Sequence, residues 1–599
     1  MERSSKNSLA RLCRSSNTSL CCSGTVLSVI ATRAKQISEL LQELLCKSKF
    51  VAIVSQFTFA SILESKNFIM QLLVLYVSLI LHIAAFCSGD DFAFASYFQN
   101  NMVLQREPQR AVIWGYGTVG ASVMVSLDSD IYMTTVTTGP NGKGMWVVKL
   151  EPQPVGGPRV LSAVQNADEI FNAVILENIL FGDVWVCSGQ SNMQFTMSQV
   201  FNASAELELT SNYPDIRIFT VAETESETSM YDLMSIEENW SIPSKETVGG
   251  PVWKYFSAVC WLFGRHLYDE IQIPIGLVAS TWGGTPVESW SSNRALQKCG
   301  LNAYDTEYEK LMEYLKQKEH QMLKENKKFK INPNENSVLW NAMIHPLLNM
   351  TIKGAIWYQG EQNAIYHPDK YACSFPAMIT DWRRSWYESH QETDSEFPFG
   401  FVQLAPVNED HALFANIRWH QTADIGYVPN SIMQNTFMAV AIDLPDDDSP
   451  YGMVHPRDKE DVAKRLVLGA FNVSYGLEYN PQGPIILSAA RTADGEIVVT
   501  YPQDQKLQVQ EVGNFEICCD TNKCDPMDPK PSPEWYWAPI LSHTQHTITL
   551  SSKGCEMIKA KPQILRYAWG QRPCDFKSCS VYNDIGLPAP PFVMEVKDL

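Results

Sequence analysis

Val184-Trp185-Val186-Cys187-Ser188-Gly189-Gln190-Ser191-Asn192-Met193 is the stretch that decides the fold. Its first four residues favour β-structure and predict a buried strand, and the small polar residues after them are typical of a turn from a parallel strand into a helix. Ser191 lies in that turn. Open α/β sheets bind ligands at the carboxyl ends of their strands, so the Ser191 hydroxyl is a candidate nucleophile. An isolated serine at this position is more often a helix N-cap.

Three later segments repeat this arrangement. Residues 275–280 form a strand pattern that runs into Gly283-Gly284-Thr285. Residues 355–358 run into Gly360-Glu361-Gln362-Asn363, and residues 437–442 lead through an acidic loop to His455. We therefore expect a serine, two glycine or amide loops and a histidine at one edge of one sheet, which is the layout an acyl-transfer site needs.

The motifs in this order resemble those of the SGNH hydrolases. Gly189-Gln190-Ser191-Asn192-Met193, Trp357-Tyr358-Gln359-Gly360-Glu361-Gln362-Asn363 and His455-Pro456-Arg457-Asp458-Lys459 are most similar to esterases that remove O-acetyl groups from sialic acids. The resemblance runs from about residue 90 to the C-terminus. It implies an α/β fold, an SGNH or flavodoxin-like three-layer α/β/α hydrolase domain, flanked by β-sandwich-type modules. The Gly-x-Ser-x-Gly elbow is a poorer match, because Met193 replaces its second glycine.

The resemblance assigns the catalytic roles. Ser191 would be the nucleophile of an acyl-enzyme mechanism, and His455 would be the base that takes its proton. The backbone amides of Ser191 and Gly284 and the side-chain amide of Asn363 would form the oxyanion hole. Taken alone, Asn363 would be read as a turn residue.

The third member of the triad is where the sequence departs from the SGNH pattern. That pattern has an aspartate three residues before the histidine, and Gly452 occupies the position here. Asp443, Asp446, Asp447 and Asp448 lie upstream. Asp448 is the first candidate because it is nearest to His455 in the chain, and Glu361 is the second.

Recognition of a sialate carboxylate is expected to rest on an arginine, because a planar two-pronged donor matches a carboxylate. Arg418 is the preferred candidate, and Arg294, Arg383 and Arg384 are alternatives. Gln190, beside the nucleophile, is a second candidate for substrate binding. The implied substrate is O-acetylated sialic acid, free or on glycoconjugates, cleaved at the 9-O position, with cleavage at the 4-O position left open. No cofactor or metal is implied, and no paired Cys spacing typical of zinc sites is present.

Composition divides the chain into five parts. Residues 1–69 are an upstream extension with nine Lys or Arg against four Asp or Glu. Residues 70–88 form an apolar signal peptide with a small-residue end, or alternatively a signal anchor. Residues 89–176 alternate as short strands and predict a β module, residues 177–475 the esterase domain, and residues 476–599 a Cys-rich β module. Apolar spacing predicts a helix over residues 252–271, and Pro456, a residue favoured at the first turn of a helix, precedes a second predicted helix over residues 458–475.

The same features predict a secreted or lysosomal glycoprotein. Four acceptor sequons begin at Asn202, Asn239, Asn349 and Asn472. Six cysteines lie within residues 518–599, as in a disulfide-stapled secreted module. After signal cleavage no stable membrane span is expected.

Charge and composition limit the alternatives. A formal charge of -19 argues against a nucleic-acid partner, which requires a basic face. Two other functions stay open beside the sialic acid esterase. One is a glycan-binding protein that kept the fold without turnover, and the other is an acetyl esterase for another carbohydrate or a general lipase.

Overall fold

The computed structural model describes residues 92–167, 170–301, 332–407, 413–510, 513–520, 522–527 and 532–599. The upstream extension and the signal peptide predicted over residues 1–88 lie outside this range. All statements below concern the described residues.

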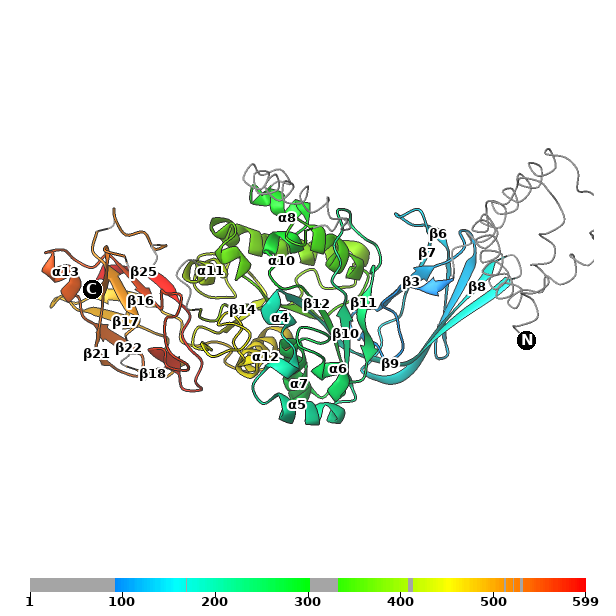
Figure 1. Cartoon of the computed structure of the whole chain (residues 1–599), viewed down its shortest axis with the longest axis horizontal. Coiled ribbons are helices and arrows are strands. Elements are labelled where there is room, and N and C mark those ends of the chain that lie inside the picture. Colours follow the sequence, from blue (N-terminus) through cyan, green and yellow to red (C-terminus); the bar gives the residue numbers. More distant parts are fainter. Residues whose placement is uncertain are drawn as a thin grey trace, which may run out of the picture. The chain divides into compact units, whose positions relative to one another are not determined.

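A largely parallel sheet forms the centre of the esterase region (Figure 1). Its neighbouring strands run in the order β11, β10, β12, β9, β13, β14, β15, and all are parallel except the edge strand β11. Every residue of β10, β12, β13, β14 and β15 is buried, which explains why the sequence shows continuous apolar runs rather than alternation. The bounds are β9 Ile170–Gly189, β10 Ile216–Val221, β11 Ile236–Ser241, β12 Ile275–Thr281, β13 Gly354–Tyr358, β14 Phe399–Gln403 and β15 Thr436–Val440.

Helices cover both faces of this sheet, so the predicted three-layer α/β/α fold is confirmed. α7 (Ala258–Ile271) and α12 (Lys459–Tyr475) pack together on one face, and α8 (Asn293–Lys298) and α10 (Tyr371–His390) lie on the other (Figure 1). The predicted helix over residues 252–271 begins later, at Ala258, because Ser257 caps it by accepting from the Cys260 amide. Asp458 caps α12 in the same way.

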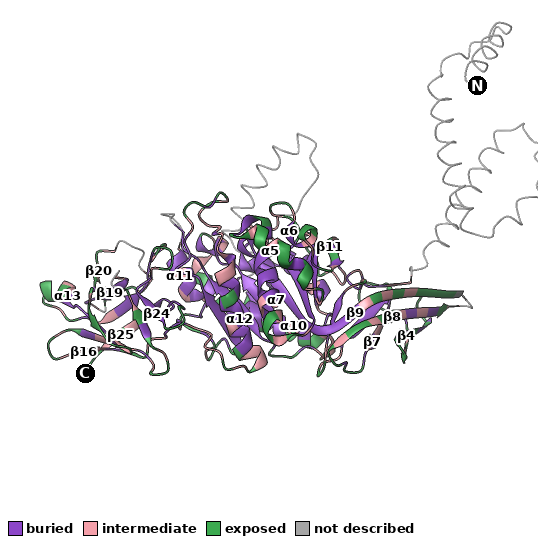
Figure 2. Ribbon diagram, turned by 90° about the horizontal axis from the view of Figure 1, so that it is seen from below, coloured by how far each residue is buried: buried purple, intermediate pink, exposed green. Residues whose placement is uncertain are grey.

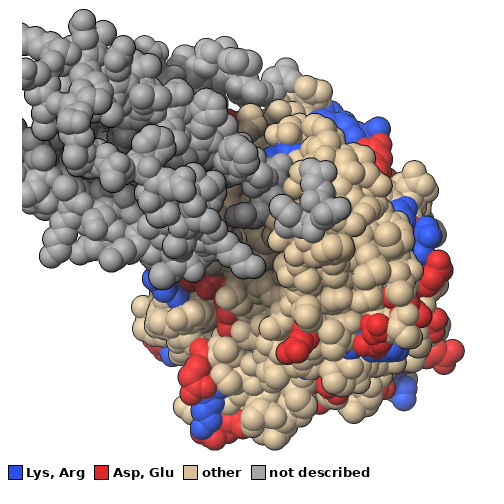
Figure 3. Space-filling model, turned by 90° about the vertical axis from the view of Figure 1, so that its right-hand side faces the viewer, with Lys and Arg blue, Asp and Glu red and all other residues tan. Residues whose placement is uncertain are grey.

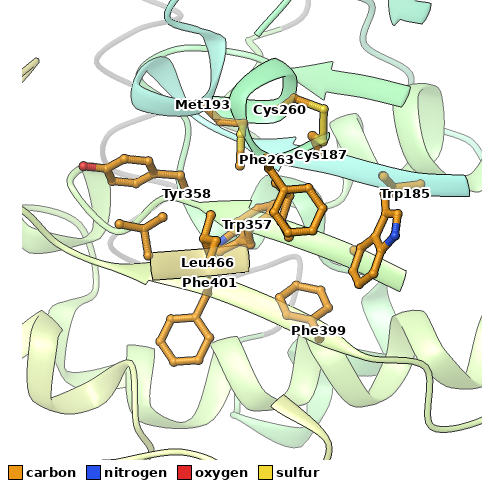
Figure 4. Packing of buried hydrophobic residues seen from close by; sticks show 14 of the residues in the cluster. Trp185, Cys187, Met193, Cys260, Phe263, Trp357, Tyr358, Phe399, Phe401 and Leu466 are labelled. Atoms are coloured by element: carbon orange, nitrogen blue, oxygen red, sulfur yellow. A yellow bond between two sulfur atoms is a disulfide. The ribbon is translucent and has the colours of Figure 1, made fainter. Parts of the chain in front are cut away.

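Large aromatic side chains pack between the sheet and the helices on both of its faces (Figure 4). Trp185 of β9 meets Phe263 of α7 edge to face, with ring centroids 5.1 Å apart. The Cys187–Cys260 disulfide joins the same strand to the same helix. The strand that carries the candidate nucleophile is therefore fixed to α7 by packing and by a covalent bond.

Two β modules flank the central sheet. In the first, β1 (Ala93–Phe94), β3 (Val112–Tyr116), β7 (Gly144–Lys149) and β6 (Thr137–Thr138) form one sheet. β4 (Ser122–Leu127), β5 (Asp130–Thr135) and β8 (Gly156–Ala167) join the N-terminal half of β9, while β2 (Val103–Gln105) pairs with β9 further along. The boundary predicted at residue 176 thus falls inside β9, which belongs to both the module and the central sheet.

The second module follows α12. Its larger sheet has the order β20, β19, β23, β25, β16, β17, β22, β21, and β18 pairs with β24 beside it. The bounds are β16 Ser488–Arg491, β17 Ile497–Thr500, β18 Leu507–Val509, β19 Phe515–Cys518, β20 Trp535–Trp537, β21 Ile540–His543, β22 Thr547–Leu550, β23 Ile564–Tyr567, β24 Val581–Asn583 and β25 Phe592–Asp598. The six cysteines pair as Cys518–Cys524, Cys519–Cys555 and Cys574–Cys579. Two further disulfides, Cys187–Cys260 and Cys299–Cys373, lie in the esterase region, where the sequence did not suggest them.

Burial and charge follow this layout. Buried residues concentrate in the central strands, whereas α5 (Ala203–Leu209) and α6 (Lys245–Gly249) carry many exposed ones (Figure 2). On the face drawn in Figure 3, acidic and basic side chains are interspersed among uncharged ones. No helix within the described ranges is long and apolar enough to cross a membrane.

Candidate active site

Ser191 is the first residue of α4 (Ser191–Gln194), directly after the tight turn that ends β9. The turn requires glycine, because Gly189 has φ +140° and a Cβ there would lie 2.2 Å from the Tyr358 carbonyl oxygen. The Gln190 amide donates to that same carbonyl at 3.0 Å. Gln190, not Ser191, occupies the N-cap position, so the Ser191 hydroxyl is not used as a helix cap.

The Ser191 hydroxyl is paired with His455 across the carboxyl edge of the sheet. Ser191 Oγ lies 2.8 Å from His455 Nε2. His455 Nδ1 lies 2.7 Å from the Tyr451 carbonyl oxygen. A carbonyl can only accept, so Nδ1 carries the proton and Nε2 is free to accept the serine proton. The two residues that the motifs singled out thus meet in the tautomer a general base requires.

A backbone carbonyl takes the place of the third carboxylate. Gly452 adopts φ +93°, a conformation that side chains disfavour, and its turn aims the Tyr451 carbonyl at the imidazole. Asp448 is exposed and does not contact His455, so the prediction that it completes a triad is wrong. Glu361 does not contact the imidazole either, and its prediction as the direct partner is also wrong.

The acidic run before His455 is used to hold the loop. Asp443 pairs with Arg465 at 2.6 Å, Asp446 pairs with Arg457 at 2.6 Å, and Asp447 pairs with Arg572 at 2.8 Å. Each of these three carboxylates forms an ion pair with an arginine, and the ion pairs anchor the loop that presents His455.

Glu361 belongs to a buried polar network beneath the Ser191–His455 pair. Its Oε1 accepts from Asn192 Nδ2 at 2.5 Å, and the same Nδ2 donates to the Val454 carbonyl at 2.8 Å. Lys459 Nζ donates to Asn192 Oδ1 at 2.6 Å. Burial raises the pKa of Glu361 and lowers that of Lys459 to about 7. Asn192 thus links the helix that begins with Ser191, the Glu361 loop and Val454, the residue next to His455.

The imidazole sits in an aromatic setting. The Phe195 ring stacks on it with centroids 6.3 Å apart, and Trp253 meets it edge to face at 5.0 Å. Burial lowers the pKa of His455, the Tyr451 hydrogen bond opposes this, and nearby Lys459 lowers it further. Neither aromatic residue was predicted, because apolar side chains in loops give no sequence signal for a site.

Gly284 lines the same pocket as Ser191 and has a left-handed φ of +72°. Its backbone amide is available for a developing oxyanion, and so is the Ser191 amide in the first turn of α4.

Asn363 makes different contacts. Its Nδ2 donates to Glu288 Oε2 at 2.9 Å and to the Tyr366 carbonyl at 3.1 Å, and the residue is fully buried. The prediction that Asn363 donates to the oxyanion is therefore wrong in this structure.

Arg418 is not a substrate residue. It is fully buried, and its guanidinium donates to the carbonyls of Leu404, Ala405, Gly570 and Gln571 at 2.7–3.0 Å. Burial lowers its pKa to about 9. The prediction was wrong because sequence position near the site does not reveal that the side chain points into the protein.

The alternative arginines are also committed elsewhere. Arg294 pairs with Asp381 and Glu388, and Arg384 pairs with Glu388. Arg383 is buried and donates to three carbonyls.

A cavity of about 460 Å³ opens at the Ser191–His455 pair, within the range of small-molecule sites. It is lined by Gln190, Ser191, Gln194, Trp253, Gly283, Gly284, Glu361, Gln362, Ile365, Phe414, Val454 and His455. Gln190 is buried, and its side-chain oxygen accepts from the Gly360 and Gln362 amides. Among the described lining residues there is no Lys or Arg. The described residues also contain no cluster of His, Cys, Asp and Glu that could hold a metal ion.

The chain is similar to known carbohydrate esterases. Residues 181–456 match the family model described as carbohydrate esterase, sialic acid-specific acetylesterase, and residues 488–596 match the sialate O-acetylesterase C-terminal domain. A carbohydrate acetylesterase from Xanthomonas citri superposes with a TM-score of 0.66 at 26% identity, covering 84% of this chain and 99% of that one. The fold and the comparisons define a carbohydrate esterase of the SGNH-like class.

The particular family follows from close relatives. The chain is 46% identical to the sialate O-acetylesterase of Mus musculus over 528 residues, covering 85% of this chain and 95% of the mouse protein. It is 44% identical to that of Homo sapiens over 524 residues, covering 85% and 94%. The chain belongs to the sialate O-acetylesterase family.

Proposed function

We propose that this protein hydrolyses O-acetyl esters of sialic acids, at the 9-O and also the 4-O position, with Ser191 as nucleophile and His455 as general base. The observation that carries the proposal is the 2.8 Å contact between Ser191 Oγ and His455 Nε2, made in a cavity at the carboxyl edge of the sheet. Membership of the sialate O-acetylesterase family supports the choice of substrate.

The reaction begins when Nε2 takes the hydroxyl proton and Oγ attacks the acetyl carbonyl carbon. The negative charge that develops on the carbonyl oxygen is stabilised by the Gly284 and Ser191 amides. His455 then returns the proton to the sugar oxygen as the C–O bond breaks. A water molecule, deprotonated by the same nitrogen, releases acetate from Ser191.

The Tyr451 carbonyl keeps Nδ1 protonated throughout, so the imidazole always presents Nε2 to the reacting groups. A carbonyl dipole stabilises the imidazolium less than a full carboxylate would. The surrounding rings and the low dielectric strengthen the interaction that remains.

The lining of the cavity offers neutral amide donors, not cations, to the negative charge of the substrate. The glutamines at positions 190, 194 and 362 line the cavity, and no cation does so among the described residues. We infer that the sialate carboxylate is held by amide groups, with the acetyl methyl against apolar residues such as Ile365 and Phe414.

The test is acetate release from O-acetyl sialic acid by the purified chain and by Ser191→Ala. We expect the variant to lose about 10³-fold or more in kcat, because the nucleophile has no substitute. Its melting temperature should be unchanged, since the hydroxyl contributes little packing. If the variant keeps more than about a tenth of the wild-type rate, Ser191 is not the nucleophile.

An acetyl esterase for another carbohydrate is the second candidate, favoured by the similarity to the Xanthomonas citri acetylesterase. Comparing kcat/KM on O-acetyl sialic acid with that on a neutral acetylated sugar separates the two. The non-catalytic alternative predicts no turnover of either substrate, contrary to the Ser191–His455 geometry.

We also propose that the protein is secreted or lysosomal. Five disulfides within the described residues are typical of proteins from oxidising compartments. N-terminal sequencing of protein from medium or lysosomes should find a chain that starts near residues 88–90. An intact residue 1–69 segment on a membrane-bound product would instead favour the anchor.

A further inference from the structure

A second, larger cavity of about 680 Å³ lies between the N-terminal β module and the esterase region. One wall consists of residues 134–147 of strands β5, β6 and β7, among them Thr134, Thr135, Thr137 and Thr138. The other wall comes from residues 345–349 and from residues 385–390 at the end of α10. It shares no lining residue with the catalytic cavity.

Ion pairs beside this cavity join the N-terminal β module to the esterase region. Glu392 accepts from Lys149 at 2.9 Å and from Arg110 at 2.6 Å, and Lys149 also donates to the His390 carbonyl at 2.6 Å. The Thr351 hydroxyl donates to the Arg110 carbonyl at 2.9 Å. These contacts fix the two walls at one end and leave the space between them open.

Asn349, the acceptor of the Asn349-Met350-Thr351 sequon, lines this cavity. Its Oδ1 accepts from the Ser389 hydroxyl at 2.6 Å, whereas its Nδ2 has no hydrogen-bond partner among the described residues. The other three acceptor asparagines do not line the cavity, and all three are exposed. An N-linked sugar uses Nδ2 and leaves Oδ1 in place, so attachment preserves the Ser389 bond.

The lining fits a neutral sugar. Arg294 is neutralised by Asp381 and Glu388, so no unpaired cation is left to attract an anion. Burial lowers the pKa values of His345 and His390, which keeps both imidazoles neutral near pH 7. Threonine hydroxyls and neutral imidazoles are partners for sugar hydroxyls, and Tyr231 and Val147 offer apolar surface to the ring faces.

We propose that Asn349 carries an N-glycan whose first sugars fill this cavity and hold the N-terminal β module against the esterase domain. Attachment joins Asn349 Nδ2 to the anomeric carbon of an oligosaccharide carried on a lipid pyrophosphate. The C–O bond to the pyrophosphate breaks, the lipid pyrophosphate leaves and the amide loses one proton. Transfer precedes folding, so the later burial of Thr351 does not prevent it. The proposal requires entry into the secretory pathway but not the proposed catalytic activity.

The test uses the glycosylated protein recovered from culture medium, with glycopeptide mass spectrometry at each sequon during digestion by a peptide N-glycosidase under native conditions. We expect Asn349 to be occupied and its glycan to be released at least about 10-fold more slowly than that of Asn472, because release requires local opening. Asn472 is the matched control, since it is exposed on α12.

Two variants separate cavity filling from simple attachment. Thr137→Trp, which occupies the cavity without touching the sequon, should bring release at Asn349 to the control rate. Asn349→Gln should lower the melting temperature more than Asn472→Gln. An unoccupied Asn349, or a release rate equal to that of Asn472 in the wild-type protein, overturns the proposal.

Discussion

His455, the base of the proposed dyad, differs from the histidine of a usual catalytic triad in the partner of its Nδ1. That partner is a backbone carbonyl oxygen and not a carboxylate. The Tyr451 carbonyl fixes the tautomer at 2.7 Å but adds no negative charge. His455 therefore lacks the group that usually raises the pKa of a catalytic histidine, and burial lowers that pKa instead.

The pH dependence of hydrolysis should reflect the lowered pKa of His455. Only neutral His455 can accept the serine proton, and a lowered pKa keeps it neutral down to a more acidic pH. The acid limb of kcat/KM should therefore have its midpoint below about 6.5, the ordinary value for histidine. Activity should persist in mildly acidic buffer and fall only as the pH drops through that lowered pKa.

The control for this profile is a substrate without a titrating group, such as a neutral acetyl ester, measured over the pH range in which the fold is intact. A midpoint at or above the ordinary histidine value would contradict the role assigned to burial. It would indicate a carboxylate near Nδ1 in the working enzyme.

The meeting of Ser191 and His455 could be predicted from the sequence because each follows a strand pattern, and parallel strands bring such residues to one edge of a sheet. The Tyr451 carbonyl could not, since every residue has one and only the turn at Gly452 aims it. Asn363 was misassigned for a related reason. Its amide can serve an oxyanion or a buried carboxylate, and the choice depends on Glu288, which lies far away in sequence.

Strand β9 and helix α7 form the unit that holds Ser191, the proposed nucleophile. The Cys187–Cys260 disulfide joins them and closes a loop with a sequence separation of 73. Cys574–Cys579, in the second β module, has a separation of only 5. Because closing a longer loop restricts the unfolded chain more, the first bond should stabilise the fold more than the second.

Replacing both cysteines of each pair by alanine should reveal the difference. We expect the free energy of unfolding to fall by about 4 kcal/mol for Cys187 and Cys260, and by about 2 kcal/mol for Cys574 and Cys579. Denaturant titration of the two double variants measures this. Equal losses would show that loop length does not govern these bonds.

The central strands could be predicted because parallel strands buried on both faces leave continuous apolar runs, as at residues 184–187 and 355–358. The length of β9 could not. It passes from the β module into the central sheet, and nothing in residues 170–189 marks where one partner sheet ends and the next begins.

The modules are joined by buried polar contacts as well as by the chain. Arg418 of the esterase domain donates to the carbonyls of Gly570 and Gln571 in the second β module. The charged guanidinium thus satisfies acceptors from both sides of the interface. Its role is to connect the two parts of the molecule, which explains its complete burial.

Arg418→Ala should destabilise the protein by about 3 kcal/mol or more, because several buried carbonyls lose their donor at a cost of about 1–3 kcal/mol each. Arg384→Ala is the control, since Arg384 is exposed and should cost less than about 1 kcal/mol. Unfolding in guanidinium chloride measures the free energy of unfolding of both variants. A stable Arg418→Ala variant with raised KM for O-acetyl sialic acid alone would restore the substrate-binding role.

The central claim is that the acetyl group of the substrate is transferred transiently to the Ser191 hydroxyl. Rapid-quench mass spectrometry of the enzyme mixed with excess O-acetyl sialic acid tests this claim most directly. During turnover, the proteolytic peptide that contains Ser191 should carry one acetyl group. The modification should disappear when substrate is exhausted and be absent in Ser191→Ala. Steady hydrolysis with no acetylated Ser191 peptide, or with acetylation at another residue, would contradict the claim.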